Sequence, residues 1–401
     1  MLIISKQEAF YTKAIFFLFG FGCMMIAPRT PDLKANLHIN NGTLGTLVSL
    51  TALGSFTAFL YMGQIVHRFG VQKVLTIVVT TLFGAMALQP HIHSLWLFAL
   101  DQVVCGASWA GFHISVNTQA LHRQKLSGIP ILPKLHGTWT AGALSTAVVA
   151  VGITSHVTLA VHLGVGMALV WLATLFIIYK LRDVLLEGSL EHTDEDSKAS
   201  VKSILTYLRE EWVIVVAVTM GIMLEFSTND WSALFTKEDI KASSSLSILP
   251  YIAFGAGMVL ARFNLHTLYK SFTERQLIRS TAIFGGVSFI IAIQVASHIA
   301  ANHHSLALVV AITGYFCGGL GSSFMSPGIT TIATRKSRFP SAFVVAQMAL
   351  VNTSIFFITR IVISWVAQAT SITTALMVPA VIFTFTAAFA KLGSDTLHPT
   401  D

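Results

Sequence analysis

The chain has 401 residues, of which 54% are apolar and 11% are charged, and its formal net charge is +7. So few charges exclude an ordinary water-soluble domain and are typical of a chain that crosses a membrane many times. The excess of lysine and arginine therefore belongs to loops that face anionic lipid, and we expect no nucleic-acid partner.

Apolar stretches of about the 20 residues that a bilayer requires recur along the whole chain. None of them shows the two-residue alternation of a membrane β-barrel. We therefore expect an all-α membrane protein with twelve transmembrane helices, near residues 10–31, 43–66, 74–90, 94–118, 135–155, 157–180, 211–235, 245–268, 277–298, 304–328, 340–366 and 370–390.

Lysine and arginine fall almost entirely in loops on one side of this pattern, and only Lys34, Lys237 and Lys241 fall on the other. The positive-inside rule then predicts that both termini are cytoplasmic. Arg29 lies in the outer half of the first helix. Its guanidinium is suited to binding a carboxylate of a substrate, and the alternative is a side chain that reaches the outer headgroups.

The fourth helix carries a polar face. Asp101 and Gln102 lie near its beginning, and Trp109, His113 and Asn117 follow at spacings that share a face with Gln102. Such a face is too polar for lipid, so we expect it to line the interior. Trp139 on the fifth helix could stack on a sugar or another ring; interhelical hydrogen bonding is the alternative for the whole set.

A long polar segment near residues 182–202 divides the twelve predicted spans into two sets of six. We expect an N-terminal half (1–181), a cytoplasmic linker (182–202) and a C-terminal half (203–401). A G-x4-R-F sequence occurs at Gly63–Phe69 and again at Gly257–Phe263. We interpret it as a repeat in equivalent loops, which predicts two pseudo-symmetric six-helix halves with a binding site between them.

Two carboxylates interrupt the seventh apolar stretch, Glu225 and Asp230, and Asn229 adjoins the second. A carboxylate at mid-membrane depth costs about 2.5–3.5 kcal/mol, so it requires a reason. Their spacing places them about 140° apart around a helix, which indicates separate roles. Glu225 suits proton coupling or substrate binding, and Asp230 suits a gate or a helix-end partner. A structural ion pair with Arg29 or Arg360 is the alternative.

The eleventh helix contributes Arg360, a second candidate for recognising an anionic group, and Asn352, a candidate cavity residue. Histidines gather in the outer loops, but we interpret them as solvated, and we expect neither a metal nor a cofactor. No catalytic or nucleotide-binding motif occurs in a suitable context, so we do not expect an enzyme.

The sequence Gly63-x4-Arg68-x-Gly70-x-x-Lys73 resembles the loop motif of the major facilitator superfamily. Four further pieces resemble its branch of MosC, YbjJ and fucose-permease-like proteins. They are Arg29-x-Pro31, Asn117-x-Gln119-Ala120, Leu135-His136-Gly137 and Glu225-x4-Asp230-Trp231-Ser232. The resemblance implies a monomeric transporter of the bacterial inner membrane, with gating by Gly63, His67, Arg68, Gly70, Lys73 and Arg262.

Two departures from the family pattern bear on gating and on the site. The loop motif usually has aspartate where this chain has His67, so a permanent anion is replaced by an imidazole that can be neutral or cationic. The branch usually has glycine where this chain has Phe226, which narrows the space beside Glu225.

The predicted function is secondary active transport by alternating access, coupled to protons and moving a small polar organic solute of a sugar-like kind. Export of a drug or metabolite is the alternative within transport. A non-transporting membrane receptor or assembly protein on the same fold is the alternative from another class. Retention of costly polar groups in the predicted helices favours transport.

Overall fold

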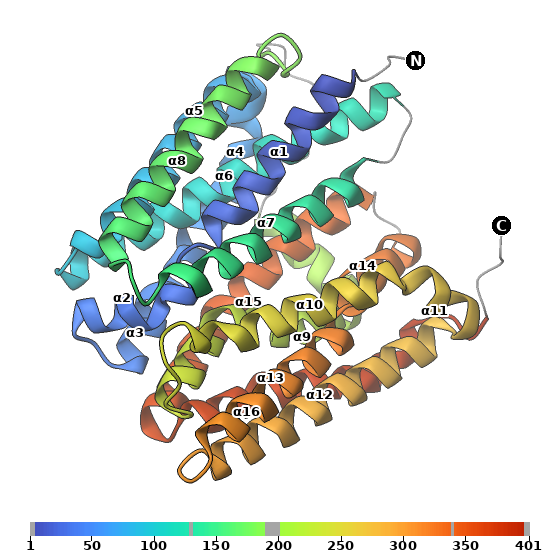
Figure 1. The fold of residues 1–401 in the computed structure, drawn as a ribbon. Coiled ribbons are helices and arrows are strands. Elements are labelled where there is room, and N and C mark those ends of the chain that lie inside the picture. The colour runs from blue at the N-terminus through green and yellow to red at the C-terminus, as the bar shows by residue number, and fades with distance from the viewer. Residues whose placement is uncertain (1–4, 128–130, 189–200, 338–340, 397–401) are drawn as a thin grey trace. The chain divides into compact units, whose positions relative to one another are not determined.

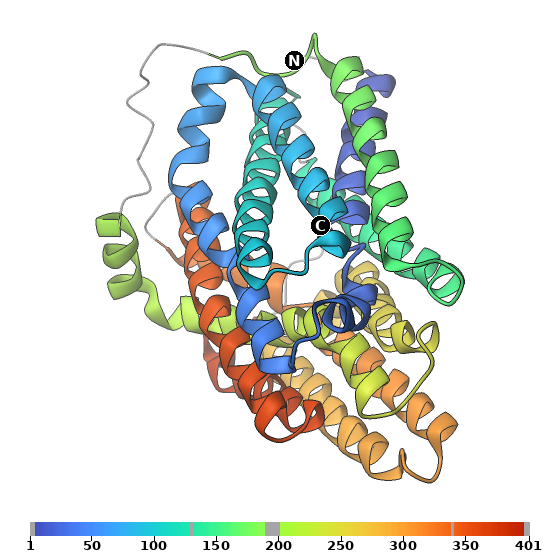
Figure 2. The same cartoon turned by 90° about the vertical axis from the view of Figure 1, so that its left-hand side faces the viewer.

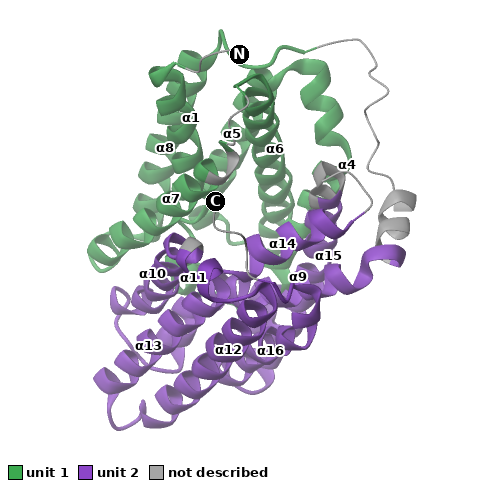
Figure 3. Cartoon of the chain, turned by 90° about the vertical axis from the view of Figure 1, so that its right-hand side faces the viewer, with its two compact units in different colours: residues 1–39, 46–200 green, residues 40–45, 201–401 purple. Residues whose placement is uncertain are grey.

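The computed structural model describes residues 5–127, 131–188, 201–337 and 341–396 (Figure 1). Within these ranges every regular element is a helix, so the all-α prediction is confirmed for the described residues. The chain divides into two compact units, residues 1–39 with 46–200 and residues 40–45 with 201–401 (Figure 3). Part of the predicted linker, residues 189–200, lies outside the described residues.

Unit 1 contains six long helices and several short ones. The long helices are α1 (Lys6–Cys23), α4 (Thr51–Phe69), α5 (Val71–Leu88), α6 (Leu95–Ser127), α7 (Leu132–Ile153) and α8 (Leu159–Leu181). Between them lie η1 (Ala27–Arg29), α2 (Thr30–Leu37) and η2 (Gln89–His91), while α3 (Asn41–Ser49) begins in unit 2 and ends in unit 1.

Unit 2 begins its long helices with α9 (Val201–Glu238), which bends at Glu211 where the backbone leaves helical geometry. The elements that follow are η3 (Leu246–Ile248), α10 (Leu249–Phe263), α11 (Leu265–Ser271), α12 (Glu274–Ile299), α13 (His304–Ser322), α14 (Met325–Lys336), α15 (Ser341–Ala369), α16 (Ile372–Phe385) and η4 (Thr386–Leu392).

The same order of helix packing occurs in each unit. In unit 1, α6 packs against α4 and α5, and α8 packs against α5 and α1 (Figure 2). In unit 2, α13 packs against α10 and α12, and α16 packs against α12 and α9 (Figure 1). Small residues allow the close approaches: a Cβ on Gly106 of α6 or on Gly319 of α13 would collide with the backbone of the partner helix.

Eleven stretches within the described residues are long and apolar enough to cross a membrane. They correspond to all the predicted spans except 135–155. The helix α7 does occupy that position, but its first turns are rich in polar residues such as His136 and Thr138. The count of twelve spans therefore stays a prediction.

The two G-x4-R-F sequences do not occupy equivalent places, and our interpretation of them as equivalent loops is wrong. Phe69 ends α4, and Gly70 makes the turn into α5. Phe263 also ends α10, but α11 then continues the path to Ser271, before α12 begins at Glu274. Arg262 therefore lies well before its turn, whereas Arg68 lies directly at its own.

A buried carboxylate at the beginning of α12 joins three parts of unit 2. Glu274 is 2% exposed and receives two hydrogen bonds from Arg335 of α14, with Nη1–Oε1 at 2.9 Å and Nη2–Oε2 at 2.7 Å. The backbone N–H of Ser394 donates to Oε2 at 2.9 Å. Its place in the first turn also favours a negative charge, because the helix dipole is positive there.

We expect Glu274→Gln to destabilise the protein by about 2–3 kcal/mol, because charge-assisted hydrogen bonds contribute about 1.5–3 kcal/mol each and an amide retains part of them. Thermal unfolding in detergent measures the loss. The control is Arg275→Gln, whose partner Asp395 is 68% exposed and whose loss should cost less than about 1 kcal/mol. Equal shifts for the two variants would contradict the prediction.

Candidate functional site

A close ion pair joins α9 to α15. Arg360 Nε lies 2.6 Å from Asp230 Oδ2, and Nη2 lies 3.0 Å from Oδ1. Both side chains are about one fifth exposed, with 23% for Arg360 and 21% for Asp230. This two-pronged geometry is the strongest that a guanidinium and a carboxylate can form. The sequence left open whether Asp230 is a gate residue, a helix-end partner or a member of an ion pair. In the structure it forms an ion pair with Arg360.

Glu225, near the middle of the apolar stretch Arg209–Glu238, has a looser partner. Its Oε2 lies 3.8 Å from Arg262 Nη2, which is beyond hydrogen-bonding distance. Arg262 Nε donates instead to the carbonyl of Ser323 at 3.3 Å. Arg262 thus lies beside a membrane-depth carboxylate of its own unit, and this position does not support the predicted gating role.

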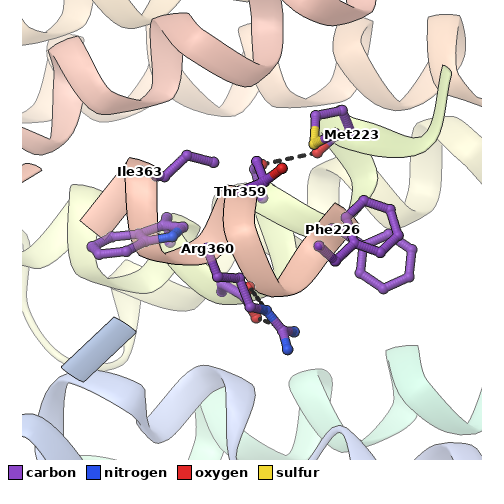
Figure 4. A pocket seen from close by; sticks show the side chains of 9 residues that line it. Met223, Phe226, Thr359, Arg360 and Ile363 are labelled. Atoms are coloured by element: carbon purple, nitrogen blue, oxygen red, sulfur yellow. Dashed lines mark hydrogen bonds and ion pairs between the residues drawn. The ribbon is translucent and has the colours of Figure 1, made fainter. Parts of the chain in front are cut away.

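A pocket lies between α9 and α15 around the Asp230–Arg360 pair (Figure 4). The Phe226 ring stacks on Phe356, with centroids 4.0 Å apart and planes at 23°. Phe226 is 37% exposed, so the ring that replaces the branch's usual glycine forms part of an accessible wall. Met223, Trp231 and Ile363 complete the apolar lining, and the only charges that line it are the paired Asp230 and Arg360.

Asn352 and Asn229 lie on the same two helices. Asn352 Oδ1 accepts a hydrogen bond from Thr219 Oγ1 at 2.7 Å, which ties α15 to α9. Asn229 is half-buried beside Asp230.

Arg29 is engaged in a structural cluster of unit 1. It is 3% exposed; its Nε lies 2.6 Å from Asp32 Oδ2, and Nη1 and Nη2 donate to the carbonyl of Val157 at 3.1 and 3.2 Å. His162 Nδ1 is 3.3 Å from Nη1. The guanidinium binds the turn between α7 and α8. Its contacts therefore match neither of the two roles considered from the sequence, substrate binding and reaching the outer headgroups.

The carboxylate of Asp101 on α6 is surrounded by neutral groups. Gln89 Nε2 donates to Oδ2 at 2.9 Å and Gln102 Nε2 at 3.2 Å, with Cys105 Sγ at 3.7 Å. Asp101 and Gln102 are both buried. Asp101 and Gln102 therefore take part in hydrogen bonds within unit 1. Hydrogen bonding was the alternative to a cavity-lining role for these residues.

Farther along α6 the polar face carries an aromatic tier. The Trp109 indole and the His113 ring are nearly parallel, with planes at 12° and centroids 5.4 Å apart. His136 of α7 is exposed, and its ring centre lies 6.2 Å from that of His113. Asn117 donates to the carbonyl of His113 at 2.7 Å. Trp139 is half-buried against the core of unit 1, and its backbone carbonyl meets α1 at Gly20.

The loop-motif residues lie where α4 turns into α5. Gly63, Arg68 and Lys73 are exposed, and His67 is half-buried. The Arg68 guanidinium lies over the neighbouring Phe69 ring, 5.3 Å from its centre. Gly70 has a φ of +80°, a conformation that favours glycine.

Apart from Arg29 and the loop-motif residues at the α4–α5 turn, the predicted site residues form two groups, one around α9 in unit 2 and one along α6 in unit 1. Sequence reasoning missed the partners Gln89, Thr219 and Phe356, because a polar or aromatic residue in a span does not reveal which distant helix it faces. Within the described residues, no group of three or more histidine, cysteine, aspartate or glutamate side chains could hold a metal ion.

Comparison with known proteins finds a family and several proteins to which this chain is similar. Residues 14–364 match the family model described as Major Facilitator Superfamily. An uncharacterized MFS-type transporter of Yersinia pestis is 25% identical over 391 residues, which cover 97% of this chain and 96% of that protein.

Solved structures are similar in fold at low identity. The nucleoside transporter NupG matches with a TM-score of 0.71 and 13% identity, covering 96% of this chain and 98% of that one. A D-xylose–proton symporter matches with a TM-score of 0.69 and 13% identity, covering 96% of each chain. The chain therefore belongs to the Major Facilitator Superfamily, a family of multi-pass membrane transporters and not of enzymes.

Proposed function

We propose that this transporter is a proton-coupled secondary carrier that works by alternating access on a small, uncharged polar solute. The recurrence of one packing order in both units supports a design of two related six-helix halves. The distribution of lysine and arginine supports cytoplasmic termini, and a bacterial relative supports the bacterial plasma membrane.

The observation that carries proton coupling is the contrast between the two carboxylates of α9. Protonating Asp230 would weaken two short hydrogen bonds with Arg360. Protonating Glu225 would lose one contact of 3.8 Å, the only polar contact of its carboxylate within the described residues. Because charge-assisted hydrogen bonds contribute about 1.5–3 kcal/mol each, Glu225 can exchange a proton at lower cost. We assign proton coupling to Glu225 and positioning to Asp230.

The lining of the pocket favours an uncharged solute with a ring face, although the enclosed space of about 10 Å³ admits only water in this conformation, so solute binding requires the pocket to open. Its only ion pair is satisfied internally, so a charged solute would have to compete with an existing partner. The Phe226–Phe356 stack offers a flat apolar wall, on which the C–H face of a sugar or the face of a heterocycle can pack. Two structural neighbours, named as a nucleoside transporter and a D-xylose–proton symporter, are in line with this class.

Gating by Gly63, His67, Arg68, Gly70 and Lys73 stays part of the proposal. These residues surround a sharp turn, which is a suitable place for a contact that changes during the cycle. Arg262 no longer belongs to this set.

We expect Glu225→Gln to abolish solute accumulation driven by a pH gradient while sparing solute exchange, because glutamine keeps the shape and removes the titratable group. The solute is first identified by ligand-dependent thermal shifts across uncharged sugars and nucleosides. Uptake into proteoliposomes with and without a pH gradient then measures coupling.

Asp183→Asn is the control for that assay, since Asp183 is a carboxylate 82% exposed at the surface. Gradient-driven accumulation by Glu225→Gln at the wild-type level would overturn the assignment. Outward pumping would identify an exporter, and binding without flux would favour a receptor.

We expect Asp230→Asn and Arg360→Gln each to lower the free energy of unfolding, and the double variant to lose less than their sum. A partly buried two-pronged pair should give a coupling energy of about 0.5–3 kcal/mol in such a cycle. The matched control is the exposed pair Arg182–Asp183, whose atoms are 3.4 Å apart and whose coupling should be near zero. Additive losses at Asp230 and Arg360 would contradict a positioning pair.

A further inference from the structure

The segment that follows α8 is held by a glutamine of α6. Gln119, buried at 7% exposure, donates from Nε2 to the carbonyl of Val184 at 2.8 Å. Its Oε1 accepts the N–H of Leu186 at 2.9 Å. One side-chain amide thus satisfies two backbone groups of the segment that leaves α8.

The same segment is held a second time by the turn between α4 and α5. The N–H of Val71, the first residue of α5, donates to the carbonyl of Leu186 at 2.9 Å. This N–H has no partner inside its helix, so the linker caps α5. Both backbone groups of Leu186 are therefore bound, one by α6 and one by α5.

Two glycines let the turn and the segment touch. A Cβ on Gly70 would lie 2.8 Å from the backbone nitrogen of Gly188 and 3.1 Å from the carbonyl oxygen of Leu186. A Cβ on Gly188 would lie 2.9 Å from the nitrogen of Gly70 and would collide with the carbonyl of Arg68. Neither position can carry a side chain without separating the two backbones.

Apolar contacts support the hydrogen bonds. Leu185 is 8% exposed and belongs to the hydrophobic core of unit 1, against which Val184 and Leu186 also pack. Figure 2 shows this segment in green, running from the end of α8 across the ends of the blue helices. It is packed and hydrogen-bonded to unit 1.

We propose that Gln119, Gly70 and Gly188 form a clasp that anchors residues 184–188 to unit 1. Capping α5 would require only the Leu186 carbonyl, whereas here a buried residue of a third helix uses both atoms of its amide on the segment. Gln119 is therefore a positioning residue, and the glycine of the loop motif is required by this contact as well as by its positive φ.

The clasp has a mechanical consequence. It ties the end of α8, the α4–α5 turn and α6 together, so these elements move as one body. Residues 184–188 therefore lie directly beside the turn to which we assign gating.

Hydrogen exchange of the purified full-length protein, read by mass spectrometry, tests the clasp. We expect Gln119→Met, which keeps the size but cannot bind both backbone groups, to speed exchange in the peptide that carries residues 184–188 about tenfold at the Leu186 N–H, because that N–H loses its acceptor. Exchange in the core of α6 should stay unchanged. The control Gln72→Leu, at an exposed glutamine of α5, should exchange as wild type does.

Gly188→Ala tests the clasp independently of any effect on α6. It should speed hydrogen exchange of residues 184–188. Gly84→Ala should not, because a Cβ on Gly84 would meet nothing within 4 Å. Transport by the two clasp variants should show slower turnover at unchanged solute affinity. Wild-type exchange of residues 184–188 in both variants would overturn the proposal. Because exchange requires no transport, that result is separate from a failure of proton coupling at Glu225.

Discussion

A charge inside a membrane-spanning helix must find a partner, and this constraint organises the polar structure of the protein. Two carboxylates of α9 meet guanidinium groups from two other helices, Arg262 of α10 and Arg360 of α15. In unit 1 Asp101 is bound instead by neutral donors, Gln89 and Gln102. Near the helix ends of that unit, Arg123 of α6 donates to Glu8 of α1 at 2.5 Å. The Asp230–Arg360 and Glu8–Arg123 pairs join helices that are far apart in sequence, whereas Glu225–Arg262 joins the successive helices α9 and α10. These charges therefore also help to fix which helices are neighbours.

The geometry of each pair then separates positioning from chemistry. A guanidinium with two short contacts to one carboxylate, as at Asp230, holds both side chains in place and leaves the local charge neutral. A pair at 3.8 Å, as at Glu225, leaves the carboxylate only weakly committed to its cation. The same residue types, five positions apart on one helix, are thus suited to different tasks by a difference of about one ångström.

Backbone constraints matter as much as charge at the end of unit 1. The loop motif is usually considered in terms of its charged residues, yet its Gly70 lies against the backbone of Gly188. The amide of Gln119 completes this contact from a third helix. A turn that already requires glycine for its φ therefore also anchors the segment that follows α8.

Composition and hydropathy alone determined the all-α membrane class and the approximate spans, because burial in lipid imposes long apolar runs on the sequence itself. The cost of charge in those runs singled out Glu225, Asp230 and Arg360 in the same way. Only the tertiary structure decided which carboxylate meets which guanidinium, that Arg29 is buried, and that Gln119 binds the backbone of Val184 and Leu186. Each is a contact between segments distant in the chain, and its distance and geometry depend on helix packing, which local residue patterns do not encode.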